Sequence, residues 1–153
     1  MVAMKKIEKG DWTLETKPQM LEEDADKERT PDIVSEIGKS FDIKFLFERL
    51  LLESDNTAYK MITRNLTDEE LNSIGEAVGL DEIFTDNGKI SAKDYSRLFR
   101  ALYLAVYLNE ENSQYLLTLL QNSEFKDFIR AGIPSDVPFA HKWGTNLYIH
   151  TYA

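Results

Sequence analysis

The stretch "LLLESDNTAYKMI" (residues 50–62) places three consecutive polar residues, Ser54, Asp55 and Asn56, between two apolar-periodic runs. The run before it has the 0, 3, 4, 7, 8 spacing of a helix with one buried face, and its apolar members are Ile43, Leu46, Phe47, Leu50 and Leu51. The run after it predicts a second helix over about 57–65. Ser, Asp or Asn just before a helix is most often a cap, so the triplet is either a helix start or a polar cluster held at a site.

The sequence around this stretch predicts a mostly helical chain. Residues 2–9 resemble the last turns of a helix that stops at Gly10, and Ser40 is the expected N-cap of the helix ending near Ser54. Thr67 and Glu70 have the spacing of a capping box, and their helix ends at Gly79.

The second half of the chain begins with a turn at "FTDNGKI" (84–90) and the strongest helix at "SAKDYSRLFRALYLAVYL" (91–108). The apolar stripe predicted for this helix is Tyr95, Leu98, Phe99, Leu102 and Val106. Further helices are expected over about 110–121 and 124–130. From Val137 onward the composition favours extended structure, so the fold class is α+β with a large helical part.

Composition excludes several classes of function. The 153 residues carry a net charge of −9, which argues against a sequence-independent grip on nucleic acid. No cysteine is present, which excludes thiol catalysis and disulfides, and no apolar run approaches the roughly 20 residues of a membrane span. The acidic stretch "LEEDADKE" (21–28) is interpreted as a solvated loop.

A second polar motif lies late in the chain, in the predicted strand "HKWGT" (141–145), where Lys142 is followed two residues later by Gly144. An S-D-N before a helix and a K-x-G on a later strand, separated by a helical region, form a known pairing. His141 and His150 have no clustered carboxylates around them and make a poor metal site. We therefore predict neither a metal nor a cofactor.

Taken together with "AGIPSDVPFAHKWG" (131–144), these motifs resemble the penicillin-recognising serine hydrolases, which include class A β-lactamases and penicillin-binding transpeptidases and carboxypeptidases. The resemblance covers about residues 1–145. It implies a β-lactamase/transpeptidase-like fold, with a helical subdomain over 31–134 and parts of an α/β subdomain at 1–20 and 135–153. The whole chain, 1–153, is then one partial domain.

The family's first motif, S-x-x-K, supplies the nucleophilic serine, and we do not identify it here. The nearest string considered, "SFDIK" (40–44), has one residue too many and lies too close to S-D-N. We expect the nucleophile upstream of Met1, which makes the chain a fragment that is inactive alone. We also expect exposed apolar surface on the face that meets the missing helix and sheet.

The resemblance implies roles for the matched residues. Ser54 relays a proton toward the leaving group, Asn56 holds the lysine of the first motif and contacts the substrate amide, and Lys142 attracts the substrate carboxylate. Gly144 lets the substrate lie against the strand, and the backbone N–H of Thr145 forms half of the oxyanion hole. Asp55 is expected to be structural.

Two departures from the family pattern leave the function open. Trp143 stands where the family has Thr or Ser, and strand alternation lets its ring simply pack. The deacylating glutamate motif of class A β-lactamases is missing, and Glu82 is the nearest acid. This favours a penicillin-binding or peptidase-like relative over an efficient β-lactamase.

The implied substrates are β-lactams or cell-wall D-alanyl peptides, and the implied location is outside the cytoplasm. Two other hypotheses remain: a degenerate homologue that binds without catalysis, and a helical interaction domain with coincidental motifs. The oligomeric state is not predicted.

Overall fold

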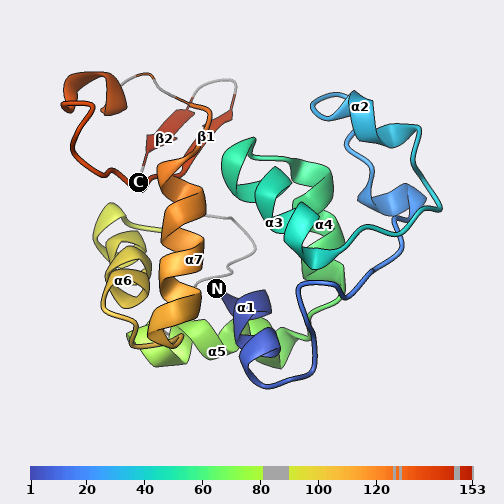
Figure 1. Cartoon of the computed structure of the whole chain (residues 1–153), viewed down its shortest axis with the longest axis horizontal. Helices are drawn as coiled ribbons and strands as arrows, with labels where there is room; N and C mark the ends of the chain where they lie inside the picture. The colour runs from blue at the N-terminus through green and yellow to red at the C-terminus, as the bar shows by residue number, and fades with distance from the viewer. Residues whose placement is uncertain (81–89, 126, 128, 147–148, 153) are drawn as a thin grey trace.

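The computed structural model describes residues 1–80, 90–125, 127, 129–146 and 149–152. Figure 1 shows a largely helical chain that ends in a small β-hairpin. The elements, in chain order, are α1 (Val2–Glu8), η1 (Glu22–Asp24), α2 (Pro31–Val34), α3 (Ile43–Leu52), α4 (Asn56–Arg64), α5 (Asp68–Val78), α6 (Ala92–Tyr103), α7 (Glu110–Gln121), η2 (Arg130–Gly132), β1 (Trp143–Asn146) and β2 (Ile149–Tyr152).

Short polar side chains begin most of the longer helices by accepting hydrogen bonds from otherwise unpaired backbone N–H groups. The predicted capping box of α5 is confirmed, because Thr67 and Glu70 each bind the other's backbone, and Gly79 ends the helix in the left-handed conformation. Ser91 caps α6, and its hydroxyl accepts a hydrogen bond from the Asp94 N–H. The prediction for α3 was wrong: its cap is Asp42, whose carboxylate accepts from the Phe45 N–H, and Ser40 forms an isolated bridge with Gln19.

The core lies where the helices meet. Helix α7 packs against both α3 and α6, and α3 packs against α4 (Figure 1). The apolar stripe predicted for α3 is confirmed in its first turns, since Ile43, Leu46 and Phe47 are buried. Other core residues come from many parts of the chain, and include Met4, Met20, Ala58, Met61, Ile62, Ile74, Leu102, Leu108, Leu116, Leu117 and Leu120.

The extended C-terminal segment forms an antiparallel pair of strands, as its composition predicts. In the register of β1 and β2, Trp143 lies opposite Tyr152, and Gly144 lies opposite Thr151. This hairpin lies near one end of α7 (Figure 1). It brings the residues before β1 close to the helical part of the molecule.

Two local predictions in the second half of the chain were wrong. Helix α6 ends at Tyr103, and Ala105 adopts a positive φ of 51°, so Val106 leaves the helical periodicity and is 66% exposed. Among the described residues of 124–130 there is no α-helix, and only the 3-10 turn η2 begins at Arg130. The turn predicted at 84–90 falls almost wholly outside the described residues.

The acidic segment 21–28 is a structural anchor and not simply a solvated loop. Asp24 is 1% exposed and receives hydrogen bonds of 2.9 and 3.0 Å from Arg64 of α4. Arg64 also donates to the backbone carbonyl of Gln19 at 2.8 Å. Because a buried carboxylate must be paired, this contact holds the segment against α4.

None of the helices in the described part of the chain combines the length and the apolarity needed to cross a bilayer.

Candidate active site

The site begins at the junction between α3 and α4, where three residues reverse the chain. Asp55 is the N-cap of α4, and its carboxylate accepts hydrogen bonds from the N–H groups of Thr57 at 2.7 Å and Ala58 at 3.1 Å. Ser54 has a φ of +63°. A non-glycine residue in this region is strained, and such residues cluster at functional sites.

Asp55 has a structural role, as predicted. It is 1% exposed and forms an ion pair with Arg49 of α3, with 2.7 Å between Nε and Oδ2. Its backbone N–H donates to the Arg49 carbonyl. Arg49 also binds Asp32 and Glu53. The ion pair and the cap together fix the position of Ser54.

Lys142 reaches Ser54 from the other end of the chain. Its Nζ donates to Ser54 Oγ at 2.5 Å and to the backbone carbonyl of Trp143 at 3.2 Å. The structure therefore brings together two of the residues that the sequence motifs singled out, 88 positions apart.

Burial changes the acidity of this lysine. Desolvation lowers the pKa of Lys142 from 10.5 to about 8. No ion pair to Lys142 is formed within the described residues that would oppose this effect. A lysine with such a pKa has an appreciable neutral fraction near neutral pH, so it can exchange a proton with the Ser54 hydroxyl.

The segment that carries Lys142, directly before β1, is held by aromatic and histidine contacts. The ring of Trp143 stacks on Phe125 with centroids 4.5 Å apart. His141 is fully buried, and its Nε2 lies 2.9 Å from the Phe125 carbonyl oxygen. Its ring also stacks on Phe139. These contacts fix the backbone just before Lys142.

Asn56 is the first residue of α4, two positions after Ser54, and its side chain is held by the acidic segment. Its Nδ2 donates to Asp26 Oδ2 at 2.7 Å. The hydrogen bond to Asn56 is the largest of the effects that lower the pKa of Asp26. In the described structure Asn56 is not hydrogen-bonded to Ser54 or Lys142.

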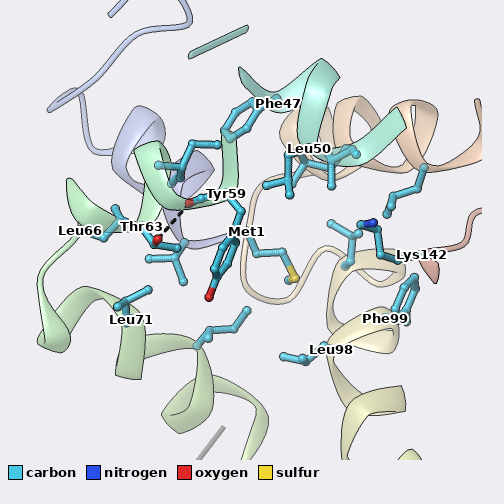
Figure 2. Close-up of a pocket in the computed structure, with 18 of the residues that line it drawn as sticks. Met1, Phe47, Leu50, Tyr59, Thr63, Leu66, Leu71, Leu98, Phe99 and Lys142 are labelled. Atoms are coloured by element: carbon cyan, nitrogen blue, oxygen red, sulfur yellow. Dashed lines mark hydrogen bonds between the residues drawn. The ribbon is translucent and has the colours of Figure 1, made fainter. Parts of the chain in front are cut away.

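An apolar cavity of about 430 Å³ adjoins Lys142. Figure 2 shows Met1 projecting among side chains from several helices, with Lys142 near Phe99 at one side. The lining comes from α1, α3, α4, α5, α6 and α7, and includes Phe47, Leu50, Ile62, Leu66, Leu71, Leu98, Phe99, Leu102, Leu116 and Leu120. The cavity is therefore lined mainly by apolar side chains, and at one side it is bordered by Lys142, which is hydrogen-bonded to Ser54.

Each of the remaining predicted site residues either has its backbone placed in the structure or lies outside the described part of the chain. Gly144 lies in β1, and Thr145 follows it in the same strand with its backbone paired to His150. Glu82 lies outside the described residues. Within the described parts of the chain, no group of three or more His, Asp or Glu side chains is placed to hold a metal ion.

The sequence contains one literal S-x-x-K string, at residues 123–126. It comes after S-D-N in the chain, which reverses the order of the family motifs. Ser123 is fully buried just beyond the end of α7, and Lys126 lies outside the described residues. A serine without solvent access cannot attack a substrate, so this string is not the nucleophile motif.

The motifs missed the residues that hold the site in place. Arg49, Asp26 and Asp24 have partners 6, 30 and 40 residues away, respectively. Charge patterning within a few residues of each gives no signal for such pairs. The Asp42 cap of α3 could have been predicted, because Asp is a favoured N-cap residue and Asp42 lies directly before the first helical residue, Ile43.

A family model described as "Beta-lactamase enzyme family" matches residues 1–150. A search of curated proteins found no match. Three similar solved structures are PBP-A, with 23% identity and a TM-score of 0.81, a β-lactamase from Xanthomonas campestris pv. campestris, with 20% and 0.79, and a β-lactamase from Sphaerobacter thermophilus, with 16% and 0.83.

These structural matches cover nearly all of this chain but not all of the other proteins. They include 94%, 95% and 99% of this chain, and 58%, 60% and 62% of PBP-A and of the Xanthomonas and Sphaerobacter proteins, respectively. The chain thus spans about three-fifths of the length of these structures, and at this identity the likeness concerns the fold. With a family model that matches almost its whole length, the chain belongs to the beta-lactamase enzyme family.

Proposed function

We propose that this chain forms part of the active site of a serine hydrolase that acts on β-lactams or D-alanyl peptides through an acyl-serine intermediate. The observation that carries the proposal is the 2.5 Å hydrogen bond between Ser54 and Lys142, which unites the S-D-N and K-W-G motifs. A penicillin G acyl-enzyme has been solved for a variant of PBP-A, which has the same fold. The nucleophile is supplied by an S-x-x-K segment outside this chain.

In this proposal Ser54 and Lys142 together deliver a proton to the nitrogen of the leaving group. The Ser54 hydroxyl gives its proton to the leaving nitrogen and recovers one from the reaction's general base, while Lys142 holds the hydroxyl in place. The cationic form of Lys142 also attracts the substrate carboxylate. The backbone N–H of Thr145 binds the developing oxyanion, and Gly144 and Trp143 border the substrate on β1.

Asn56 contacts the substrate through the part of its amide that Asp26 leaves available. Asp26 accepts from one N–H of Nδ2, so the side-chain oxygen and the second N–H can bind the lysine of the first motif and the substrate amide. The apolar cavity beside Lys142 supports a helical segment at this position, since its lining suits buried side chains of the segment that carries the nucleophile.

The alternative function is a degenerate homologue that binds a cell-wall peptide without catalysis. Trp143 favours it, because an indole at this position supplies no hydroxyl for the substrate carboxylate. Either function places the protein outside the cytoplasm.

The coding sequence upstream of Met1 distinguishes these two functions. The catalytic proposal expects an in-frame S-x-x-K motif shortly before the codons of α1. A ribosome-binding site and start codon directly at Met1 would remove the nucleophile from the gene and leave only the binding function.

A further inference from the structure

We propose that Ser54 and Lys142 also form a serine–lysine dyad that accepts acyl groups from activated esters in this chain by itself. The inference concerns a reaction at Ser54, and it does not require the S-x-x-K nucleophile of the proposed function. It rests on the geometry of the pair, on the conformation of Ser54 and on the apolar cavity next to Lys142.

Nζ of Lys142 and Oγ of Ser54 are joined by a direct hydrogen bond, with no other group between them. The two atoms are in direct hydrogen-bond contact, as a nucleophile and its base must be, and serine–lysine pairs serve as nucleophile and base on other folds. Ser54 is held in its strained conformation by the neighbouring cap and ion pair of Asp55. The hydroxyl is therefore oriented before a substrate arrives.

Burial gives Lys142 the property that a base requires. Its pKa is lowered to about 8 by desolvation, so a neutral amine is present at mildly alkaline pH. Asp55 and Glu53 are both paired with Arg49, and neither forms an ion pair with Lys142 in the described structure. Of the ionisable side chains, Tyr59 and Tyr95 line the same cavity as Lys142, as does Met1 at the chain's first residue, and Glu53 and Asp55 flank Ser54 in the sequence.

The cavity indicates the class of substrate. Its volume of about 430 Å³ lies within the usual range for small-molecule sites, and its lining is largely apolar. Because Lys142 lines it and binds Ser54, an acyl chain inside the cavity would bring its carbonyl carbon to the dyad. The ligand class is thus an aryl ester of a short or medium-chain carboxylic acid.

The reaction is a simple acyl transfer. The Ser54 hydroxyl transfers its proton to neutral Lys142 Nζ while Oγ forms a bond to the ester carbonyl carbon. The bond from that carbon to the aryl oxygen then breaks, which leaves an acyl-serine, a lysine ammonium and a phenolate. A nitrophenolate departs without being protonated, whereas the ring nitrogen of a β-lactam requires a proton donor and a complete oxyanion hole. Penicillin is therefore not expected to acylate this chain.

The test uses the chain with p-nitrophenyl hexanoate. The release of nitrophenolate is followed by its visible absorbance over a pH series. The acylated residue is then located by peptide mass spectrometry. Ser54→Gly removes the hydroxyl and tolerates the positive φ, so it retains the fold. Lys142→Arg keeps the charge but cannot act as a base. Ser96→Ala, an exposed site on α6, is the control.

The expected result is a single hexanoyl group on Ser54, formed at a rate that rises with pH around 8, the pKa of Lys142. Ser54→Gly and Lys142→Arg each lower that rate at least about tenfold, while Ser96→Ala does not change it. Acylation of Lys142 itself, equal rates in all variants, or no adduct would each overturn the inference. None of these results bears on whether a longer protein uses an S-x-x-K serine.

Discussion

The side-chain amide of Asn56 donates a hydrogen bond of 2.7 Å to the carboxylate of Asp26. A carboxylate only accepts hydrogen bonds, so the nitrogen of the amide must face Asp26 and its oxygen must face away. The backbone N–H of Asp26 donates in turn to Thr57 Oγ1 at 3.0 Å. The segment before α2 thus sets the orientation of a residue that the S-D-N motif assigns to substrate binding.

Asp26→Ala is expected to destabilise the protein in a pH-dependent way. The hydrogen bond from Asn56 lowers the pKa of Asp26 below 3.8, so its stabilisation is full above that pH and is lost as pH falls through the lower value of the folded state. Urea unfolding of both proteins between about pH 2 and 6 measures the difference in free energy. A difference that stays constant over this range would contradict the assigned contact.

Asp55→Ala is expected to lower the free energy of unfolding by about 3 kcal/mol, because it removes the cap of α4 and one buried partner of Arg49. The matched control is Asp32→Ala, since Asp32 binds the same arginine with a side chain that is 62% exposed. That control should change stability by less than about 1 kcal/mol. Equal losses in the two variants would show that burial does not distinguish the two ion pairs.

Ser54→Gly is expected to be more stable than Ser54→Ala by about 1 kcal/mol. Both variants lose the hydroxyl and its contact with Lys142, and they differ in how well they tolerate the φ of +63°. Glycine also gains freedom in the unfolded chain, which offsets part of its advantage, so thermal and urea unfolding of the pair measure the strain that exceeds this effect. A Ser54→Ala variant that is more stable than Ser54→Gly would mean that residue 54 does not hold a left-handed conformation in solution.

Lys142→Met is expected to stabilise the protein most at neutral pH. Because the folded pKa of about 8 lies below the ordinary 10.5, the unfolded chain binds more protons between these values, and wild-type stability rises with pH across that window. The advantage of the variant should therefore shrink from pH 8 to about 10. Carbon-13 NMR titration of the lysine side chains measures the pKa directly, and a value near 10.5 would contradict the desolvation.

The local signals in the sequence predicted most of the helices. The Thr67–Glu70 box and Gly79 act within one helix, and the stripe of α3 repeats every turn, so neighbouring residues contain the necessary information. The predictions were wrong where the end of a helix depends on contacts with distant parts of the chain. Helix α6 ends at Tyr103 although the apolar residues continue, and Ala105 turns the chain.

The site was predictable only as far as its motifs extend. Ser54 and Lys142 were named from the sequence, and the structure joins them. The residues around this pair could not be predicted in the same way. Arg64 pairs with Asp24, 40 residues away, and Asn56 donates a hydrogen bond to Asp26, 30 residues away. Such pairings depend on how α4 packs against the acidic segment, and the composition of that segment alone suggested only solvation.

Penicillin labelling of a longer protein that contains both this chain and an S-x-x-K segment tests the central proposal most directly. The proposal predicts one acyl group on the serine of S-x-x-K, slower labelling when Lys142 is replaced by Met, and no labelling of the present chain alone. An adduct on Ser54, or a longer protein that is folded but not labelled, would contradict it.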